Sequence, residues 1–173
     1  MYNSVLEKEI GDGSIDYLEF GVATGESFKW FLKQNENPES RFYGFDTFDG
    51  LPEDWGPYKK GAFSTSNKLP EMDDSRGRFC QGLFQQTLPL FLKTFGNTKR
   101  KVLMMDADLY SATLYVLGTI SPLFKKDDLI FFDQFAVPTH EFRAYLDFTQ
   151  SFYMNLELIA AANNFYFVAF KVV

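Results

Sequence analysis

Residues 16–33 read DYLEFGVATGESFKWFLK, and this stretch decides the expected architecture. It opens with a short apolar run typical of a buried strand, and residues 27–34 place their apolar side chains at helical spacing. The turn between the two carries two glycines, Gly21 and Gly25, four positions apart. A strand, a glycine turn and a helix in this order predict the first unit of an α/β fold.

Strand and helix signals keep alternating after this unit, which predicts a mostly parallel sheet covered on both faces. Only three residues separate the last two strand candidates, too few for a crossover helix, so these strands should form an antiparallel hairpin. We therefore expect one doubly wound, Rossmann-like domain over residues 1–173, with seven strands, mostly parallel, and a C-terminal antiparallel hairpin. The expected strands are 16–22, 41–46, 78–83, 101–106, 128–132, 156–161 and 165–172, and the expected helices are 27–34, 85–95, 111–124 and 139–153.

Two segments lie outside this alternation. Residues 1–14 are mixed polar, without the basic start and apolar stretch of a secretory signal, and are expected to form a short lead-in or a cap helix. Residues 50–77 carry Gly, Pro, Ser, Asp and Lys without a sustained period, which predicts a loop of unusual length and a candidate lid. Its aromatic residues Trp55, Tyr58 and Phe63 could close over a ligand.

The amino-acid composition argues against several classes of protein and partner. A net charge of −6 and a pI near 4.8 argue against a nucleic-acid partner, which requires a basic surface. The sequence lacks the unbroken apolar run of about twenty residues that a membrane span needs. A single cysteine, Cys80, excludes an internal disulfide and favours a reducing, cytoplasmic location. The abundance of phenylalanine suggests apolar surface that a homodimer could cover.

The glycine spacing and two acids indicate the kind of ligand. A dinucleotide site needs Gly-x-Gly-x-x-Gly, which Gly21-x-x-x-Gly25 does not supply. Glu19, at the end of the first strand, suits an ammonium or sulfonium group better than a phosphate. Asp46, at the end of the second strand, is well placed to bridge two ribose hydroxyls, although a strand-end Asp can also be only a cap. Together they predict S-adenosylmethionine.

Five ordered blocks of the chain, between residues 17 and 148, resemble the macrocin O-methyltransferase family. This family comprises S-adenosylmethionine-dependent enzymes that methylate sugar and related hydroxyls of small molecules. The resemblance implies helices before the first strand, for which residues 1–14 are expected to leave little room. The blocks are LEFGVATGES (18–27), FYGFDTFDGLP (42–52), QGLFQQTLP (81–89), MDADLYSATLYVL (105–117) and DLIFFDQF (128–135). The cofactor residues that the resemblance implies are Glu19, Gly21, Val22, Gly25 and Ser27 for the methionine part, Asp46 and Thr47 for the ribose, Gln81 and Gly82 for the adenine, and Asp106.

The resemblance also implies a divalent ion, Mg²⁺, held by Asp106, Asp133 and Gln134. Such an ion prefers oxygen ligands and would lower the pKa of the acceptor hydroxyl and aim it at the methyl group. Gln134 stands where family members usually have a second acid, which removes one negative charge. Asp108 could compensate for that loss or simply cap the following helix. Asp106 and Asp133 are thus the expected catalytic residues, with His140, the only histidine, as a candidate base.

Three functional hypotheses follow. The leading one is an O-methyltransferase, assisted by Mg²⁺, that acts on a sugar, polyol or phenol-like hydroxyl of a small molecule. The second is a cofactor-binding protein of the same fold without transferase activity. The third, a nicotinamide-dependent oxidoreductase, rests only on analogy at the level of the fold. The sequence does not identify the methyl acceptor.

Overall fold

The computed structural model describes residues 1–173 and contains seven strands and five α-helices. The strands are β1 (Ile15–Phe20), β2 (Arg41–Asp46), β3 (Gly77–Gln81), β4 (Arg100–Met105), β5 (Leu129–Phe132), β6 (Leu156–Ala162) and β7 (Phe167–Val172). The helices are α1 (Tyr2–Glu9), α2 (Glu26–Gln34), α3 (Phe84–Leu92), α4 (Tyr110–Ile120), which continues into a 3₁₀ turn (Ser121–Leu123), and α5 (Glu141–Ser151).

All seven strands lie in one sheet, in the order β3-β2-β1-β4-β5-β7-β6. The first five are parallel to their neighbours, whereas β7 is antiparallel to both β5 and β6. The predicted doubly wound fold and its C-terminal hairpin are therefore confirmed. No helix has the length and apolar character needed to cross a membrane.

The element boundaries differ from the expected ones in ways that local chemistry explains. The lead-in over residues 1–14 contains a true helix, α1, because Val5 and Leu6 bury their side chains against the sheet. The first strand ends at Phe20, because Gly21 turns the chain with φ +95°. The fourth helix ends at Ile120 and tightens into a 3₁₀ turn, because Pro122 has no N–H to continue the α-helical ladder.

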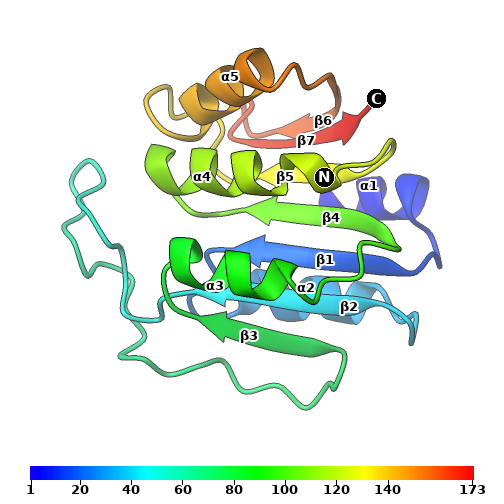
Figure 1. Ribbon diagram of the computed structural model, residues 1–173, viewed down its shortest axis with the longest axis horizontal. Coiled ribbons are helices and arrows are strands. Elements are labelled where there is room, and N and C mark those ends of the chain that lie inside the picture. The colour runs from blue at the N-terminus through cyan, green and yellow to red at the C-terminus, as the bar shows by residue number, and fades with distance from the viewer.

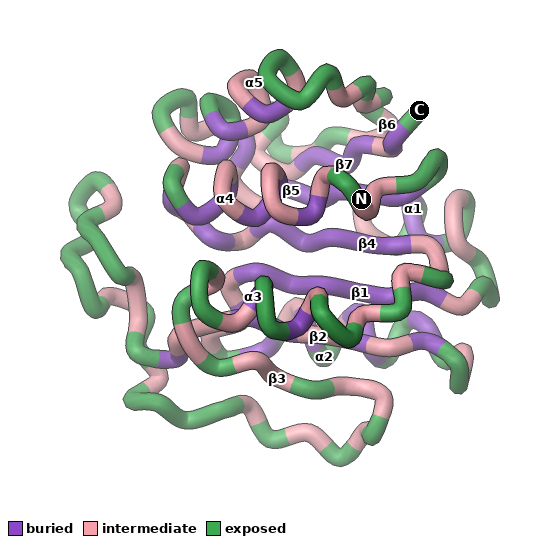
Figure 2. The backbone as a smooth tube through the Cα atoms, viewed as in Figure 1, coloured by how far each residue is buried: buried purple, intermediate pink, exposed green.

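Helices cover both faces of the sheet (Figure 1). On one face, α3, α4 and α5 bury apolar residues such as Leu88, Val116 and Phe148. On the other face, α1 and α2 bury residues such as Leu6 and Phe31. The central strands are almost entirely buried, whereas the long segment between β2 and β3 is mostly exposed (Figure 2). This arrangement leaves the ends of the parallel strands as the region open to a ligand.

The carboxyl ends of the parallel strands meet at one edge of the sheet, on the left in Figure 1. The strand order reverses between β1 and β4, where open α/β sheets place their ligands. Residues 47–76, which connect β2 to β3, contain no helix or strand and project beyond this edge. The predicted long loop is therefore confirmed.

Candidate active site

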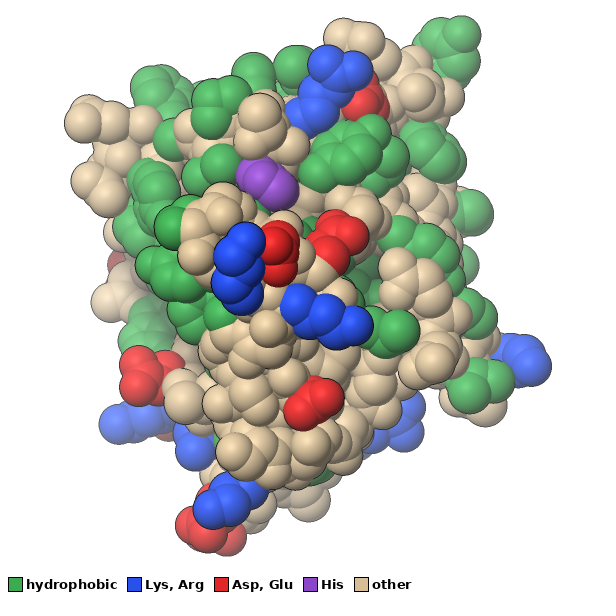
Figure 3. Space-filling view, turned by 90° about the vertical axis from the view of Figure 1, so that its left-hand side faces the viewer, with side chains coloured by type: hydrophobic (Ala, Val, Ile, Leu, Met, Phe, Trp, Pro, Cys, Tyr) green, Lys and Arg blue, Asp and Glu red, His purple; other side chains and the backbone are tan.

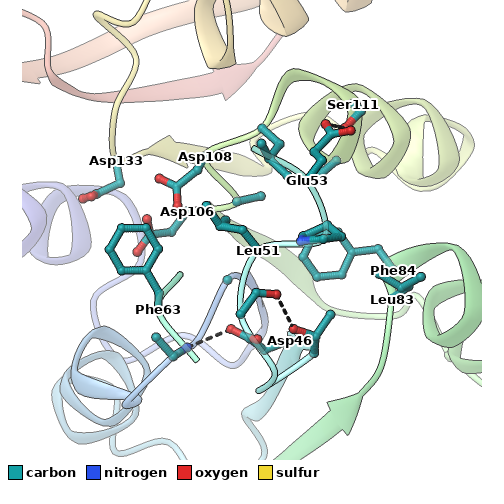
Figure 4. Close-up of a pocket in the computed structure, with 18 of the residues that line it drawn as sticks. Asp46, Leu51, Glu53, Phe63, Leu83, Phe84, Asp106, Asp108, Ser111 and Asp133 are labelled. Carbon is teal, nitrogen blue, oxygen red and sulfur yellow. Dashed lines mark hydrogen bonds between the residues drawn. The ribbon is translucent and has the colours of Figure 1, made fainter. Parts of the chain in front are cut away.

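A cavity of about 580 Å³ opens at the carboxyl edge of the sheet, within the range of small-molecule sites. The turns after β1, β2, β4 and β5 form its floor, and the β2–β3 loop and the start of α3 form its walls (Figure 4). Its lining residues are Gly21, Ala23, Asp46, Thr47, Gly50, Leu51, Pro52, Glu53, Phe63, Leu83, Phe84, Gln85, Asp106, Ala107, Asp108, Leu109, Ser111, Ala112, Asp133 and Gln134.

Gly21 brings the ends of β1 and β4 into close contact. Its φ of +95° suits glycine, and a Cβ atom at this position would lie 1.8 Å from the backbone oxygen of Asp106. That separation is far shorter than any non-bonded contact, so no other residue fits without moving the two strand ends apart. Gly21 thus fixes the floor of the cavity.

Asp46 organises the glycine turn. One carboxylate oxygen, Oδ2, accepts hydrogen bonds from the backbone N–H groups of Val22 (2.7 Å) and Ala23 (2.8 Å). The other, Oδ1, accepts the N–H of Phe48 (2.7 Å). The bond from Ala23 is dashed in Figure 4. The bonds from Val22 and Ala23 tie the turn after β1 to the turn after β2. Asp46 therefore both lines the cavity and holds its floor together.

Glu19 lies beneath the turn and does not line the cavity. Its side chain is fully buried and points to the face covered by α2, where it accepts hydrogen bonds from the hydroxyls of Ser27 (2.6 Å) and Tyr17. Burial raises the pKa of Glu19 to about 7, although both hydrogen bonds oppose that rise. Glu19 and Ser27 thus connect β1 to the first turn of α2 from within the core.

The other predicted cofactor residues divide into two groups. Thr47 lines the cavity, and its hydroxyl donates to the backbone oxygen of Gly50 (2.9 Å). Val22 and Gly25 are buried in the turn behind the lining. Gln81 and Gly82 precede the wall, where Leu83, Phe84 and Gln85 present their side chains instead. The role of Gln81 and Gly82 near an adenine stays a prediction.

Three aspartates gather at the opposite end of the cavity: Asp106 and Asp108 after β4, and Asp133 after β5 (Figure 4). Burial, followed by repulsion from Asp133, raises the pKa of Asp106 well above its ordinary value. Burial also raises the pKa of Asp108 to about 6, and it raises that of Asp133. The residues predicted as catalytic, Asp106 and Asp133, are therefore brought together.

Tyr2 and Glu141 hold this end of the cavity in place, and neither was predicted from the sequence. The hydroxyl of Tyr2, on α1, donates to Asp133 Oδ1 (3.2 Å), and the ring packs on Trp30, Phe31 and Phe131. No local pattern in the sequence could reveal a contact across 131 positions. Glu141 is fully buried, and its Oε2 accepts the backbone N–H of Gln134 (3.1 Å). The only sequence signal for Glu141 was its position as an acid in the first turn of the helix after β5.

The predicted metal ligands supply the oxygen atoms that a hard cation binds, but they do not lie close enough together to form a complete site. Asp106, Asp133 and Gln134 all line the cavity, and the side-chain oxygen of Gln134 is buried without a hydrogen-bond partner. Carboxylate and amide oxygens are what Mg²⁺ prefers. No three His, Cys, Asp or Glu side chains converge closely enough to hold an ion. An ion here would therefore need the carboxylates to draw together around it.

His140 lies next to the cavity but outside its lining. It precedes the first turn of α5, and its Nδ1 accepts the backbone N–H of Tyr110 (3.3 Å). The ring of Trp55 meets it edge to face, with 6.3 Å between centroids. His140 thus supports the loop and the start of α4, and its role as a base stays a prediction.

Comparison with solved structures identifies the fold. CalS11, a calicheamicin methyltransferase, shares 22% identity and a TM-score of 0.72, over 98% of this chain and 75% of its own. The O-methyltransferase NovP shares 21% identity and a TM-score of 0.72, over the same fractions. A structure described as cmcI-D160 Mg-SAM shares 14% identity and a TM-score of 0.62, over 99% of this chain and 69% of its own. No curated protein matches the chain.

A family model described as a methyltransferase domain matches residues 18–135. This span runs from β1 to the turn after β5 and contains every residue that lines the cavity. It also contains the five sequence blocks on which a methyltransferase was expected. The enzyme class predicted from the sequence is confirmed at this level, and the chain belongs to the methyltransferase domain family.

Proposed function

We propose that the chain is an S-adenosylmethionine-dependent O-methyltransferase that acts on a hydroxyl of a small molecule. The observation that carries the proposal is a single cavity with two distinct ends. Asp46 lies at one end, and Asp106, Asp108 and Asp133 lie at the other. The five sequence blocks favour the macrocin branch of such enzymes. The nicotinamide alternative has no support from the family match or from the glycine spacing.

The residues at the Asp46 end fit an adenosyl cofactor. Asp46 offers carboxylate oxygens to ribose hydroxyls, and Gly21 and Ala23, which line the cavity with little side chain, permit close approach of the ligand. Leu83 and Phe84 supply an apolar wall for a flat base. When bound, S-adenosylmethionine would supply the methyl group from its positively charged sulfonium. Glu19 and Ser27 act indirectly by holding the turn that carries Gly21.

The residues at the other end suit the handling of a hydroxyl. Methyl transfer to oxygen releases the hydroxyl proton, and a carboxylate whose pKa lies near neutrality is a suitable acceptor. Asp108, with a pKa of about 6, meets this requirement, and Asp106 and Asp133 lie in the same cavity. We propose that these carboxylates take the proton or hold a Mg²⁺ ion that acidifies the hydroxyl. Alignment of the reacting groups supplies much of the remaining rate.

Isothermal titration with S-adenosylhomocysteine, with Mg²⁺ and again with a chelator, tests the proposal first. We expect binding at micromolar affinity or tighter in both conditions, because the Asp46 end of the cavity needs no metal. Absence of binding in both would overturn the function. Tight binding with no methyl transfer to any hydroxyl compound would instead favour the second hypothesis, a cofactor-binding protein without transferase activity.

Asp133→Ala should lower the rate of magnesium-stimulated methyl transfer about a hundredfold, because it removes a carboxylate from the acceptor end. The affinity for S-adenosylhomocysteine should stay within a few-fold, since Asp133 is far from Asp46 in the cavity. Initial rates and titrations measure the two effects. Tyr2→Phe is the matched control, because it removes the same hydrogen bond and keeps the carboxylate. Equal losses of rate in both variants would mean that the hydrogen bond between Tyr2 and Asp133 matters, rather than the charge of Asp133.

A further inference from the structure

The β2–β3 loop contains an arm, residues 50–63, whose two ends line the cavity. Leu51 closes the arm at its base, because its backbone N–H donates to the oxygen of Ala62 (2.9 Å) and its backbone oxygen accepts the N–H of Gly61 (2.9 Å). A second pair of backbone hydrogen bonds, each of 2.8 Å, closes the arm near its tip. The arm is therefore a defined element, although it contains no helix or strand.

Contacts with the start of α4 hold the arm at the cavity. Leu51 and Trp55 pack against a small apolar cluster at the beginning of this helix. The hydroxyl of Ser111 donates to Oε1 of Glu53 (2.6 Å). Figure 3 looks onto this end of the molecule, where hydrophobic side chains lie exposed among basic and acidic ones. The arm is thus a wall of the cavity.

Phe63, at the end of the arm, lies with its ring in the cavity lining and is 50% exposed. Its neighbouring rings, Tyr58 at 4.9 Å and Trp55 at 6.3 Å between centroids, belong to the same arm. The backbone of Phe63 has a φ of +63°, a region that is unfavourable for a bulky side chain. Because the closed arm holds this backbone, the ring is presented to the cavity and does not pack in the core.

The position of Phe63 leaves it to the methyl acceptor. In Figure 4, Phe63 lies on the side of Asp106 and Asp133. The wall of Leu83 and Phe84, proposed above for the adenine, lies on the opposite side. An acceptor ring placed on Phe63 would remove two apolar faces from water, and pairs of rings gain further from their mutual orientation. An open chain has no such face to offer.

We infer that Phe63 determines acceptor specificity, by stacking on the apolar face of the ring that carries the acceptor hydroxyl. The inference rests on the proposed function, since it concerns the acceptor half of the same cavity. Phenol-like rings and saturated, sugar-like rings both have such a face, whereas acyclic polyols do not. The wall formed by the arm therefore selects for a ring.

Three diols of six carbons with adjacent hydroxyls test the inference: catechol has a flat ring, cis-1,2-cyclohexanediol a saturated ring and 1,2-hexanediol an open chain. Saturation-transfer NMR titrations measure their affinities for the protein saturated with S-adenosylhomocysteine. A chelator is present, so that no metal influences the order. We expect the better of the two ring compounds to bind about fivefold more tightly than hexanediol. Tighter binding of catechol would identify a phenol-like acceptor, and tighter binding of cyclohexanediol a sugar-like one.

Phe63→Leu should remove most of this preference, because leucine is apolar but has no ring face. Phe165→Leu is the matched control. Phe165 has a φ of +64° and is 56% exposed, close to the values for Phe63, but it lies in the turn between β6 and β7, outside the cavity. We expect this control to leave all three affinities unchanged. Since both positions share the same backbone strain, the comparison isolates the place of the ring.

Three results would overturn the inference. They are binding of hexanediol as tight as that of the rings, no binding of either ring compound, and an unchanged preference in Phe63→Leu.

Titration with S-adenosylhomocysteine separates this inference from the function itself. We expect Phe63→Leu to bind this ligand as tightly as the wild type does, because its ring is assigned to the acceptor. A wild-type protein that does not bind it would count against the function. A loss of S-adenosylhomocysteine affinity in Phe63→Leu as large as the loss of ring preference would assign Phe63 to the cofactor. That result would overturn only the specificity assignment.

Discussion

Gly21→Ala is expected to lower the free energy of unfolding by about 4 kcal/mol and to abolish binding of S-adenosylhomocysteine. The added Cβ would lie 1.8 Å from the backbone oxygen of Asp106 and 2.6 Å from its carbonyl carbon. Neither atom can yield like a flexible side chain, because both belong to the backbone at the end of β4. Relief of the overlap requires β1 and β4 to separate, and that separation deforms the floor of the cavity.

Gly61→Ala provides a control that isolates the overlap from backbone strain. Gly61 has a φ of +86°, close to the +95° of Gly21, but no atom lies within 4 Å of the position that its Cβ would take. We expect this variant to lose only about 1 kcal/mol, the cost of an alanine in the left-handed region. Urea denaturation and cofactor titration of both variants give the comparison. Similar losses in the two variants would refute the close-contact explanation.

Glu19→Gln is expected to stabilise the protein at alkaline pH, by about 3 kcal/mol. The pKa of Glu19 rises from 4.5 to about 7 on folding, mainly through burial. The folded state therefore favours the protonated carboxyl. Stability from this group is fully present below about pH 4.5, is lost as the pH rises toward 7, and stays lost above that value. Glutamine has the same shape without the ionisation, so the variant escapes this loss.

The difference in unfolding free energy between wild type and variant, measured at about pH 5 and about pH 8, tests this expectation. Comparing the two proteins at each pH removes the contributions of the other buried acids, which both share. Tyr17→Phe is a useful companion, because it deletes a hydrogen bond to Glu19 without altering the charge. A difference between wild type and Glu19→Gln that does not change with pH would mean that Glu19 keeps its ordinary ionisation in the core.

The fold could be predicted because its signals are local. The glycine turn after the first strand, the alternation of apolar runs and the short link between the last two strands each depend on neighbouring residues. Element ends were less accurate, as at Ile120, because a helix end depends on which backbone N–H groups find partners. The helix in residues 1–14 was one of two alternatives, since its formation depends on burial against a distant sheet.

The site could be predicted only in part. Asp46 was predicted from its place at a strand end, and Asp106 and Asp133 from the family resemblance; all three line the cavity, because residues at the carboxyl ends of parallel strands converge at one edge. Glu19 was placed at the correct strand end, but sequence alone could not show that its side chain points into the core. Tyr2 and Glu141 escaped notice, because Tyr2 meets Asp133 across a long stretch of chain and the burial of Glu141 depends on how α5 packs. Such contacts depend on the assembled structure.

The three backbone hydrogen bonds that Asp46 accepts have a consequence for redesign. An engineer who wished the enzyme to use cofactor analogues with altered ribose would naturally begin at this acid. Any replacement there would also release the N–H groups of Val22, Ala23 and Phe48 and so loosen two turns at once. Cofactor preference is therefore better changed at Leu83 and Gln85, exposed side chains of the cavity wall, than at Asp46 or at Phe84, whose ring packs on Phe20 of β1.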